Sequence, residues 1–225
     1  MLFGDSAPLF ADRREAGQQL GERLKELDLE GDVLVLALPR GGVPVGYEVA
    51  QALHVPLDVF VTRKIGAPEN PEFAIGAVAS DGTSILDEEV IEQLGIPDEY
   101  VVAETEHQLM EIERRMTMYR GERPPPQVEE RTVVLVDDGV ATGSTVRASL
   151  KALRKRNPGR LILAVPVGPP NTIDGLRPLA DEVVVLATPE PFWAVGRFYR
   201  YFGQTSDEEV VTLLGDSCSN SELQT

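Results

Sequence analysis

The stretch VVLVDDGVATGST, residues 133–145, has the pattern of a buried strand that leads directly into a loop of small residues. Its first four residues are aliphatic, which favours a strand buried on both faces. Two adjacent carboxylates follow, Asp137 and Asp138, and then a turn leads into a segment with helical periodicity. Backbone N–H groups between Gly139 and Thr145 can point together at one anion, supported by the positive end of the helix. The stretch predicts a strand, an anion-binding loop and a helix, with two acids at the mouth of the loop.

The residue types in this loop favour a monophosphate as the ligand. Gly139 and Gly143 allow positive φ and close approach of the backbone. Thr142, Ser144 and Thr145 supply hydroxyl donors, and either Thr142 or Ser144 is the expected N-cap of the helix. The loop has neither the Walker spacing with its lysine nor a G-x-G-x-x-G fingerprint. The two acids would repel a phosphate placed on them, but they suit hydroxyl groups or the waters of a magnesium ion.

Apolar strands alternate with helical segments along the chain, which predicts an α/β fold with a parallel twisted sheet and helices on both faces. The expected strands are residues 32–38, 56–64, 132–138, 160–167 and 181–188. The expected helices are residues 11–27, 43–53, 88–120, 144–156 and 171–179. Alternation around Asp81 and Gly82 predicts an antiparallel hairpin over residues 72–87.

Three of the expected strands end in loops of unusual composition: PRGG (39–42), TRKIG (62–66) and DDGVATGST (137–145). In an open parallel sheet, ligands bind outside the carboxyl ends of the strands, where the strand order reverses. We therefore expect the three loops to open on one edge of the sheet and to form one site.

Composition limits the classes of partner. The length of 225 residues indicates one domain. The net charge of -16 disfavours nucleic acid and anionic membranes as partners, because both are themselves negatively charged. The chain has one cysteine and two histidines, so no internal disulfide can form and a zinc site is not indicated. The first ten residues lack the pattern of a signal peptide, and no apolar run is long enough to span a membrane. We expect a cytoplasmic protein.

The acid pair followed by the T-G-S-T loop resembles the phosphoribosyl-diphosphate motif of the type I phosphoribosyltransferases. A less characterised bacterial branch of that family carries LPRGGVPVG, RKIGAP and VDDGVATGST together, as this chain does. The resemblance implies that Asp137 and Asp138 are catalytic, hold the ribose hydroxyls and bind Mg²⁺ through water molecules. It also implies that the ribose 5-phosphate lies in a loop made of Gly139, Ala141, Thr142, Gly143, Ser144 and Thr145.

The resemblance extends to the leaving group. LPRGG looks like the family's diphosphate loop, in which backbone amides and a basic side chain bind the diphosphate. It assigns this role to Pro39, Arg40, Gly41 and Gly42, with Arg40 as the catalytic cation, and adds the strand-end pair Arg63 and Lys64.

The remaining segments also have counterparts in the family. Residues 65–73 (IGAPENPEF) match the position of a mobile flap, in which Glu69 or Glu72 is a candidate base. Residues 188–215 match a small hood, where Phe192 and Trp193 either stack on the acceptor or cap the core. The segment 88–125 is a helical insertion, and the polar tail 216–225 is expected to be disordered.

The resemblance implies transfer of a phosphoribosyl group to a nitrogen acceptor, with Mg²⁺ as cofactor, small molecules as substrates and a homodimer as the family's usual assembly. A regulator that only senses phosphoribosyl diphosphate is the alternative, although such proteins usually add a DNA-binding module. A phosphorelay receiver domain is rejected, because DEVVVLATPEP has no lysine after the strand.

Overall fold

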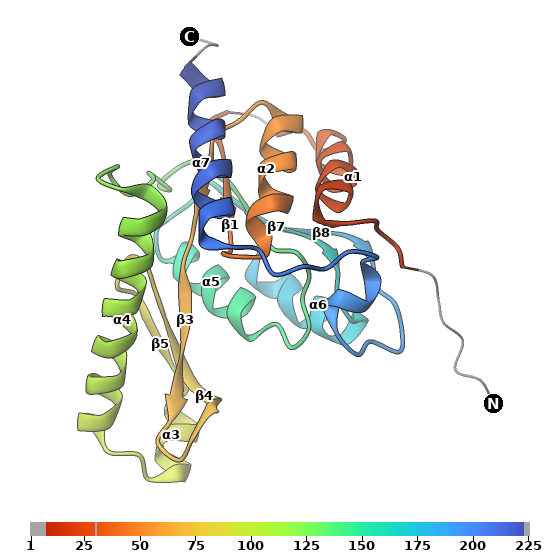
Figure 1. Ribbon diagram of the computed structural model, residues 1–225. Helices are drawn as coiled ribbons and strands as arrows, with labels where there is room; N and C mark the ends of the chain where they lie inside the picture. Colours follow the sequence, from red (N-terminus) through yellow and green to blue (C-terminus); the bar gives the residue numbers. More distant parts are fainter. Residues whose placement is uncertain (1–7, 30, 223–225) are drawn as a thin grey trace, which may run out of the picture.

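The computed structural model describes residues 8–29 and 31–222, and its centre is a five-stranded parallel sheet (Figure 1). The strand order is β2-β1-β6-β7-β8. The bounds of these strands are β1 Val33–Ala37, β2 Leu57–Val59, β6 Thr132–Val136, β7 Arg160–Val167 and β8 Glu182–Ala187. Every neighbouring pair is parallel, so the predicted α/β fold is confirmed.

Helices cover both faces of this sheet. One face carries α1 (Arg13–Lys25), α2 (Gly42–Leu53) and α7 (Asp207–Glu222). The other carries α5 (Ser144–Arg154) and α6 (Pro170–Leu176), which continues into a short 3₁₀ turn, η1 (Arg177–Leu179). Side chains of β1 alternate between the two apolar layers, and all of them are buried. This double burial explains why the strand reads as an unbroken apolar run.

A second sheet is antiparallel and projects from the first. It contains β3 (Thr62–Ala67), β4 (Asn70–Ala79) and β5 (Ser84–Leu86), in that order. The prediction of one strand over residues 56–64 was wrong. Phe60 N–H still donates to Ala37 of β1, whereas the Val61 carbonyl accepts from Ser80, next to β4. The chain thus changes sheets inside one apolar run, and periodicity cannot show where the pairing partner changes.

The predicted hairpin around Asp81 and Gly82 is confirmed. Gly82 has φ of 81°, and Thr83 N–H donates to the Asp81 carboxylate over 2.9 Å. The expected flap, residues 65–73, is not an irregular loop, because β3 and β4 extend through most of it and only the turn at Pro68 and Glu69 remains. The side chain of Glu72 lies outside the described part of the structure.

The helical insertion is present as α3 (Glu88–Leu94) and α4 (Asp98–Arg120). The two helices pack on the antiparallel sheet around a small separate core. At its carboxyl end, α4 is joined to β2 by a bidentate ion pair in which Arg120 donates to both oxygens of Asp58, over 2.8 and 2.9 Å. Both side chains are largely buried.

The C-terminal segment forms a short turn, η2 (Val195–Phe198), and then α7. The expectation of disorder over residues 216–225 was wrong for residues 216–222, which belong to α7, and residues 223–225 lie outside the described residues. Val210, Leu213 and Leu214 have helical spacing and bury one side of α7 in the core that contains α2. None of the helices in the described residues is long and apolar enough to cross a membrane.

The Arg120–Asp58 pair provides a test of how the insertion is attached. Arg120→Met leaves Asp58 partly buried without its partner, so we expect the free energy of unfolding to fall by about 3–5 kcal/mol. Arg114→Met is the matched control, because Arg114 lies on the exposed side of the same helix and its loss should change stability little. Urea denaturation of both variants measures the difference, and equal effects would contradict the prediction.

Candidate functional site

The site lies at the carboxyl ends of β1 and β6, which are neighbours in the sheet. The strand order reverses here, since β2 lies beyond β1 on one side and β7 and β8 lie beyond β6 on the other. The loop PRGG leaves β1, and the loop DDGVATGST leaves β6. Leu38 N–H extends the pairing by donating to the Val136 carbonyl over 2.9 Å, so the two loops start side by side.

Two glycines allow these loops to touch. A Cβ atom at Gly41 would overlap Oδ2 of Asp138 and lie 2.7 Å from its Cγ. At Gly42, a Cβ atom would lie 2.8 Å from the Val136 carbonyl oxygen and 2.9 Å from the Asp137 Cα. The absence of side chains at these two positions therefore brings the backbone of PRGG directly against the acid pair.

The two acids are partly buried and close to each other. Asp138 N–H donates to Asp137 Oδ1 over 2.8 Å. Burial and the neighbouring charge of Asp138 raise the pKa of Asp137 well above its usual range. Burial also raises the pKa of Asp138, although the Arg13 guanidinium opposes the shift. The site thus concentrates negative charge at a place where water hydrates it poorly.

Two residues that carry no clear signal in the sequence hold Asp138. Arg13, the first residue of α1, donates from Nε to Asp138 Oδ2 over 2.8 Å. Tyr199, in the expected hood, donates its hydroxyl hydrogen to the Asp138 carbonyl over 2.5 Å. Arg13 lies in an ordinary amphipathic helix, and within the aromatic cluster the family resemblance indicates Phe192 and Trp193 rather than Tyr199. The density of aromatic residues in that segment is the one feature of the sequence that could have pointed to Tyr199.

The loop from Gly139 to Thr145 has the backbone that an anion-binding loop requires. Gly139 and Gly143 have φ of 155° and 78°. The N-cap of α5 is Gly143, not Thr142 or Ser144 as predicted. Glycine is favoured there because the residue is in the left-handed region. The hydroxyls of Thr142 and Ser144 lie 3.3 Å apart on the exposed rim of the loop, at the positive end of α5.

The rest of the expected 5-phosphate residues lie in the same loop. Ala141 is exposed, and its carbonyl accepts a hydrogen bond from Thr172 over 3.0 Å. Thr145 is exposed on the first turn of α5. The structure therefore brings the whole predicted loop beside the acid pair.

Arg40, the basic residue of PRGG, lies near the start of α7. Its Nη1 is 3.7 Å from Asp207 Oδ2, and both side chains are one-third exposed. Tyr119 of α4 donates its hydroxyl hydrogen to the other oxygen of Asp207. Burial and this hydrogen bond raise the pKa of Tyr119 to about 12, so the phenol stays protonated.

The inserted helices are thereby connected to the site. Tyr119 and Arg40 meet at Asp207, the first residue of α7, while Arg120 fastens the end of α4 to Asp58 of β2. The insertion is anchored to the strand beside β1 and reaches the basic residue of PRGG. Its charged, solvated sequence does not suggest such a connection.

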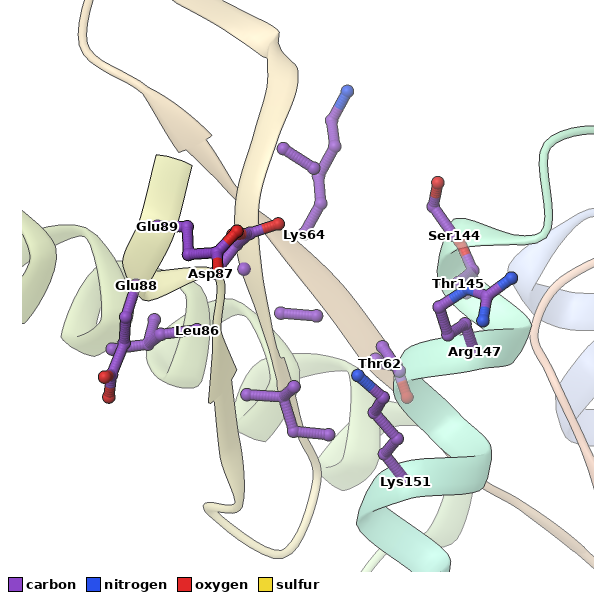
Figure 2. A pocket seen from close by; sticks show the side chains of 15 residues that line it. Thr62, Lys64, Leu86, Asp87, Glu88, Glu89, Ser144, Thr145, Arg147 and Lys151 are labelled. Atoms are coloured by element: carbon purple, nitrogen blue, oxygen red, sulfur yellow. The ribbon is translucent and has the colours of Figure 1, made fainter. Parts of the chain in front are cut away.

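Arg63 and Lys64, the strand-end pair that the resemblance adds to the diphosphate site, point in different directions. Arg63 points toward α4, where it donates to Gln108 and lies 3.9 Å from Glu111. Lys64 is exposed and lines a cavity of about 560 Å³ between the antiparallel sheet and the first turns of α5 (Figure 2). Successive residues of a strand face opposite sides. Of the two, only Lys64 is therefore on the side of the loop from Gly139 to Thr145, called the phosphate-type loop below.

Comparison with known proteins gives the same family as the motifs. A model of the family described as phosphoribosyl transferase domain matches residues 12–200. The chain belongs to this family. The match contains both loops of the site, so the acid pair and PRGG are parts of a phosphoribosyl transferase domain.

Individual relatives agree with this assignment. Two Mycobacterium tuberculosis proteins, from strains CDC 1551 and H37Rv, carry the name "Putative phosphoribosyl transferase" and are 46% identical over 206 residues, or 92% of this chain. The chain spans only 46% of the length of these relatives. The crystal structure of TT1426 from Thermus thermophilus superposes with a TM-score of 0.81 at 44% identity, covering 92% of this chain and 98% of that one. A uracil phosphoribosyltransferase of Lactobacillus gasseri is 32% identical over 79 residues, which is 35% of this chain and 38% of that protein.

The two aromatic residues expected in the hood of the phosphoribosyl transferase domain differ in environment. The Phe192 ring lies 4.9 Å from that of Phe198 and packs on the small core beneath the hood. Trp193 is 70% exposed. The structure thus shows Phe192 as a packing residue, whereas the Trp193 side chain is exposed to solvent.

The donor set suits a magnesium ion that is held mainly by waters and by substrate oxygens. Asp137 and Asp138 supply carboxylate oxygens, and Mg²⁺ in such sites commonly uses only one or two of them. No group of three or more His, Cys, Asp or Glu side chains gathers in the part of the chain that the structure describes, the acid pair included. A magnesium ion at the acid pair would therefore take most of its ligands from water and substrate.

The raised pKa of Asp137 has a consequence for stability. The folded protein binds this proton more tightly than the unfolded chain does, so stability falls as pH rises above the usual range of an aspartic acid. We expect Asp137→Asn to raise the free energy of unfolding at about pH 8, with a gain that shrinks toward about pH 4. Urea denaturation at both pH values measures this, with the exposed Asp174 changed to Asn as control. A gain of the same size at both pH values would contradict the prediction.

The contact between the two loops can be tested at Gly41. Gly41→Ala forces the Asp138 carboxylate away from PRGG, and we expect a loss of about 1–3 kcal/mol in the free energy of unfolding, the usual cost of overpacking. Gly215→Ala in α7 is the matched control, because a Cβ atom there meets open space. Chemical denaturation compares the two variants, and a Gly41→Ala variant that loses no more stability than Gly215→Ala would contradict the prediction.

Proposed function

We propose that this domain transfers the phosphoribosyl group of 5-phosphoribosyl 1-diphosphate to a nitrogen acceptor, with release of diphosphate. One observation carries the proposal: the backbone of Gly41 and Gly42 packs directly against Asp138 and Asp137. This contact puts a loop suited to diphosphate beside acids suited to ribose hydroxyls, and a phosphate-type loop follows the acids in the chain. A ligand with a 5-phosphate, a ribose and a 1-diphosphate matches these three parts in order.

The proposed reaction is a displacement at C1 of the ribose. The bond from C1 to the diphosphate oxygen breaks, a bond from C1 to the acceptor nitrogen forms, and the acceptor loses a proton. Negative charge develops on the departing diphosphate, where Arg40 and the backbone N–H groups of PRGG stabilise it. Arg40 is one-third exposed and its contact with Asp207 is long, so it can turn toward a ligand without leaving a buried charge unpaired.

The acid pair positions the sugar. Asp137 and Asp138 accept hydrogen bonds from the ribose hydroxyls, which fixes C1 relative to PRGG. They would also hold Mg²⁺, through water molecules. When bound, the metal ion supplies positive charge that neutralises the diphosphate and makes it a better leaving group.

Loop residues Ser144 and Thr145 bind the 5-phosphate in this proposal, together with the N–H groups of the preceding backbone. Lys64, which faces their side of the antiparallel sheet, is the better placed of the strand-end pair to reach a phosphate oxygen. Arg63 supports α4 instead. The flap carries Glu69 at its exposed turn as the candidate base.

We propose that the acceptor is a nucleobase that stacks on Trp193. The reaction would then belong to nucleotide salvage in the cytoplasm, and the partners of the domain would be small molecules. Because part of the chain is similar to a uracil phosphoribosyltransferase, uracil is the first acceptor to test. A homodimer is the assembly we expect. The chain spans only part of its relatives, so these statements concern the domain.

The test is magnesium-dependent diphosphate release from 5-phosphoribosyl 1-diphosphate, with uracil, purines, pyridine carboxylates and small amines as acceptors. We expect release with one class of acceptor and a loss of at least about 100-fold in Asp137→Asn/Asp138→Asn, because charge stabilisation and positioning are both removed. Asp174→Asn is the control for a change of charge at the surface.

The other outcomes are also informative. Binding of the donor without release under any acceptor would support a sensor of phosphoribosyl diphosphate in place of an enzyme. No binding of the donor in the presence of Mg²⁺ would contradict both functions.

A further inference from the structure

Arg13 makes three contacts that tie separate parts of the site together. Its Nε donates to Asp138 Oδ2 over 2.8 Å. Its Nη1 donates to the Gly203 carbonyl over 2.7 Å. The guanidinium carbon lies 3.9 Å from the centre of the Phe202 ring, and the side chain is only 13% exposed. The Arg13 side chain of α1 therefore contacts Asp138, which follows β6, and also Phe202 and Gly203, which follow β8.

These contacts belong to a closed cluster around Asp138. Phe202 stacks on Tyr199, with ring centroids 5.1 Å apart, and Tyr199 returns to the Asp138 carbonyl. The oxygen that Arg13 bonds, Oδ2, is also the atom that a Cβ at Gly41 would meet first. Asp138 is thus held at its carbonyl by Tyr199, and both Arg13 and the PRGG loop approach its Oδ2.

We propose that Arg13 is a positioning residue for ribose recognition: it fixes the Asp138 carboxylate against PRGG and couples it to the segment around Phe202 and Gly203. The inference rests on the proposed function, because it assigns Asp138 to the ribose hydroxyls. Because Arg13 bonds Oδ2 of Asp138, the carboxylate is already oriented before a ligand binds, and Oδ1 is the oxygen left for the ribose hydroxyls. This prearrangement lowers the cost of ordering the acid on binding.

The geometry requires arginine rather than any cation. The planar guanidinium donates from two nitrogens in different directions while its face lies on an aromatic ring. A lysine ammonium group can keep the charge near Asp138, but it cannot reproduce the stacked, forked arrangement. Arg13→Lys should therefore restore only part of the function.

The experiment measures binding of ribose 5-phosphate and of inorganic phosphate by calorimetry, in the full chain. Both ligands use the phosphate-type loop, but only the sugar reaches Asp138. For Arg13→Met we expect ribose 5-phosphate to bind at least about tenfold more weakly, the loss expected for one hydrogen bond to a charged group, with inorganic phosphate unchanged. Arg13→Lys should lie between Arg13→Met and the unaltered protein. Arg14→Met is the matched control, because Arg14 is the adjacent residue and its side chain is 67% exposed.

The outcomes separate this inference from the proposed function. If the unaltered protein binds 5-phosphoribosyl 1-diphosphate but does not prefer ribose 5-phosphate to inorganic phosphate, the inference is overturned and the proposed function stands; if it does not bind the donor at all, the proposed function fails. If it has that preference and Arg13→Met keeps it in full, the role of Arg13 is overturned. If both ligands weaken equally in Arg13→Met, Arg13 serves the fold alone and the inference is also overturned. A double-mutant cycle with Asp138→Asn completes the test, because a positioning role predicts that the two losses do not add.

Discussion

The contact between the Asp138 carboxylate and the backbone of Gly41 is the constraint on which the rest of the site depends. It joins the loops that leave β1 and β6, and it exists because the two strands are neighbours at the reversal of strand order. Arg13 and Tyr199 then hold Asp138 from α1 and from the C-terminal segment. Residues that are far apart in the chain thus meet at Asp138, Arg13 at its carboxylate and Tyr199 at its backbone carbonyl.

The site also shows how a local environment overrides the net charge. The chain carries a net charge of -16, yet the ligand that its loops suit is itself an anion. Backbone N–H groups at the start of α5, together with Arg40 and Lys64, place positive charge near the edge of the sheet where the loops lie. The acid pair opposes it over a few ångströms and is itself poorly hydrated.

The sequence by itself determined the five strands of the parallel sheet and most of the helices, the hairpin at Asp81 and Gly82, and two of the three loops expected at one edge of that sheet; the third, TRKIG, lies in β3 of the antiparallel sheet. These features follow from burial periodicity and turn chemistry, which are local properties of a chain. Local pattern misplaced the end of the strand over residues 56–64 and indicated disorder over residues 216–222, because pairing partners and the burial of one helix side depend on distant segments.

Only the tertiary structure decided which side chains complete the site. Arg63 and Lys64 are adjacent in sequence, yet the pleat of β3 sends one to α4 and the other to the phosphate-type loop. Arg13 and Asp207 carry no local signal at all. Their contacts arise because α1 and α7 pack on the same face of the sheet. Contacts between residues so far apart in the chain are determined by packing in three dimensions, and no local sequence pattern reveals them.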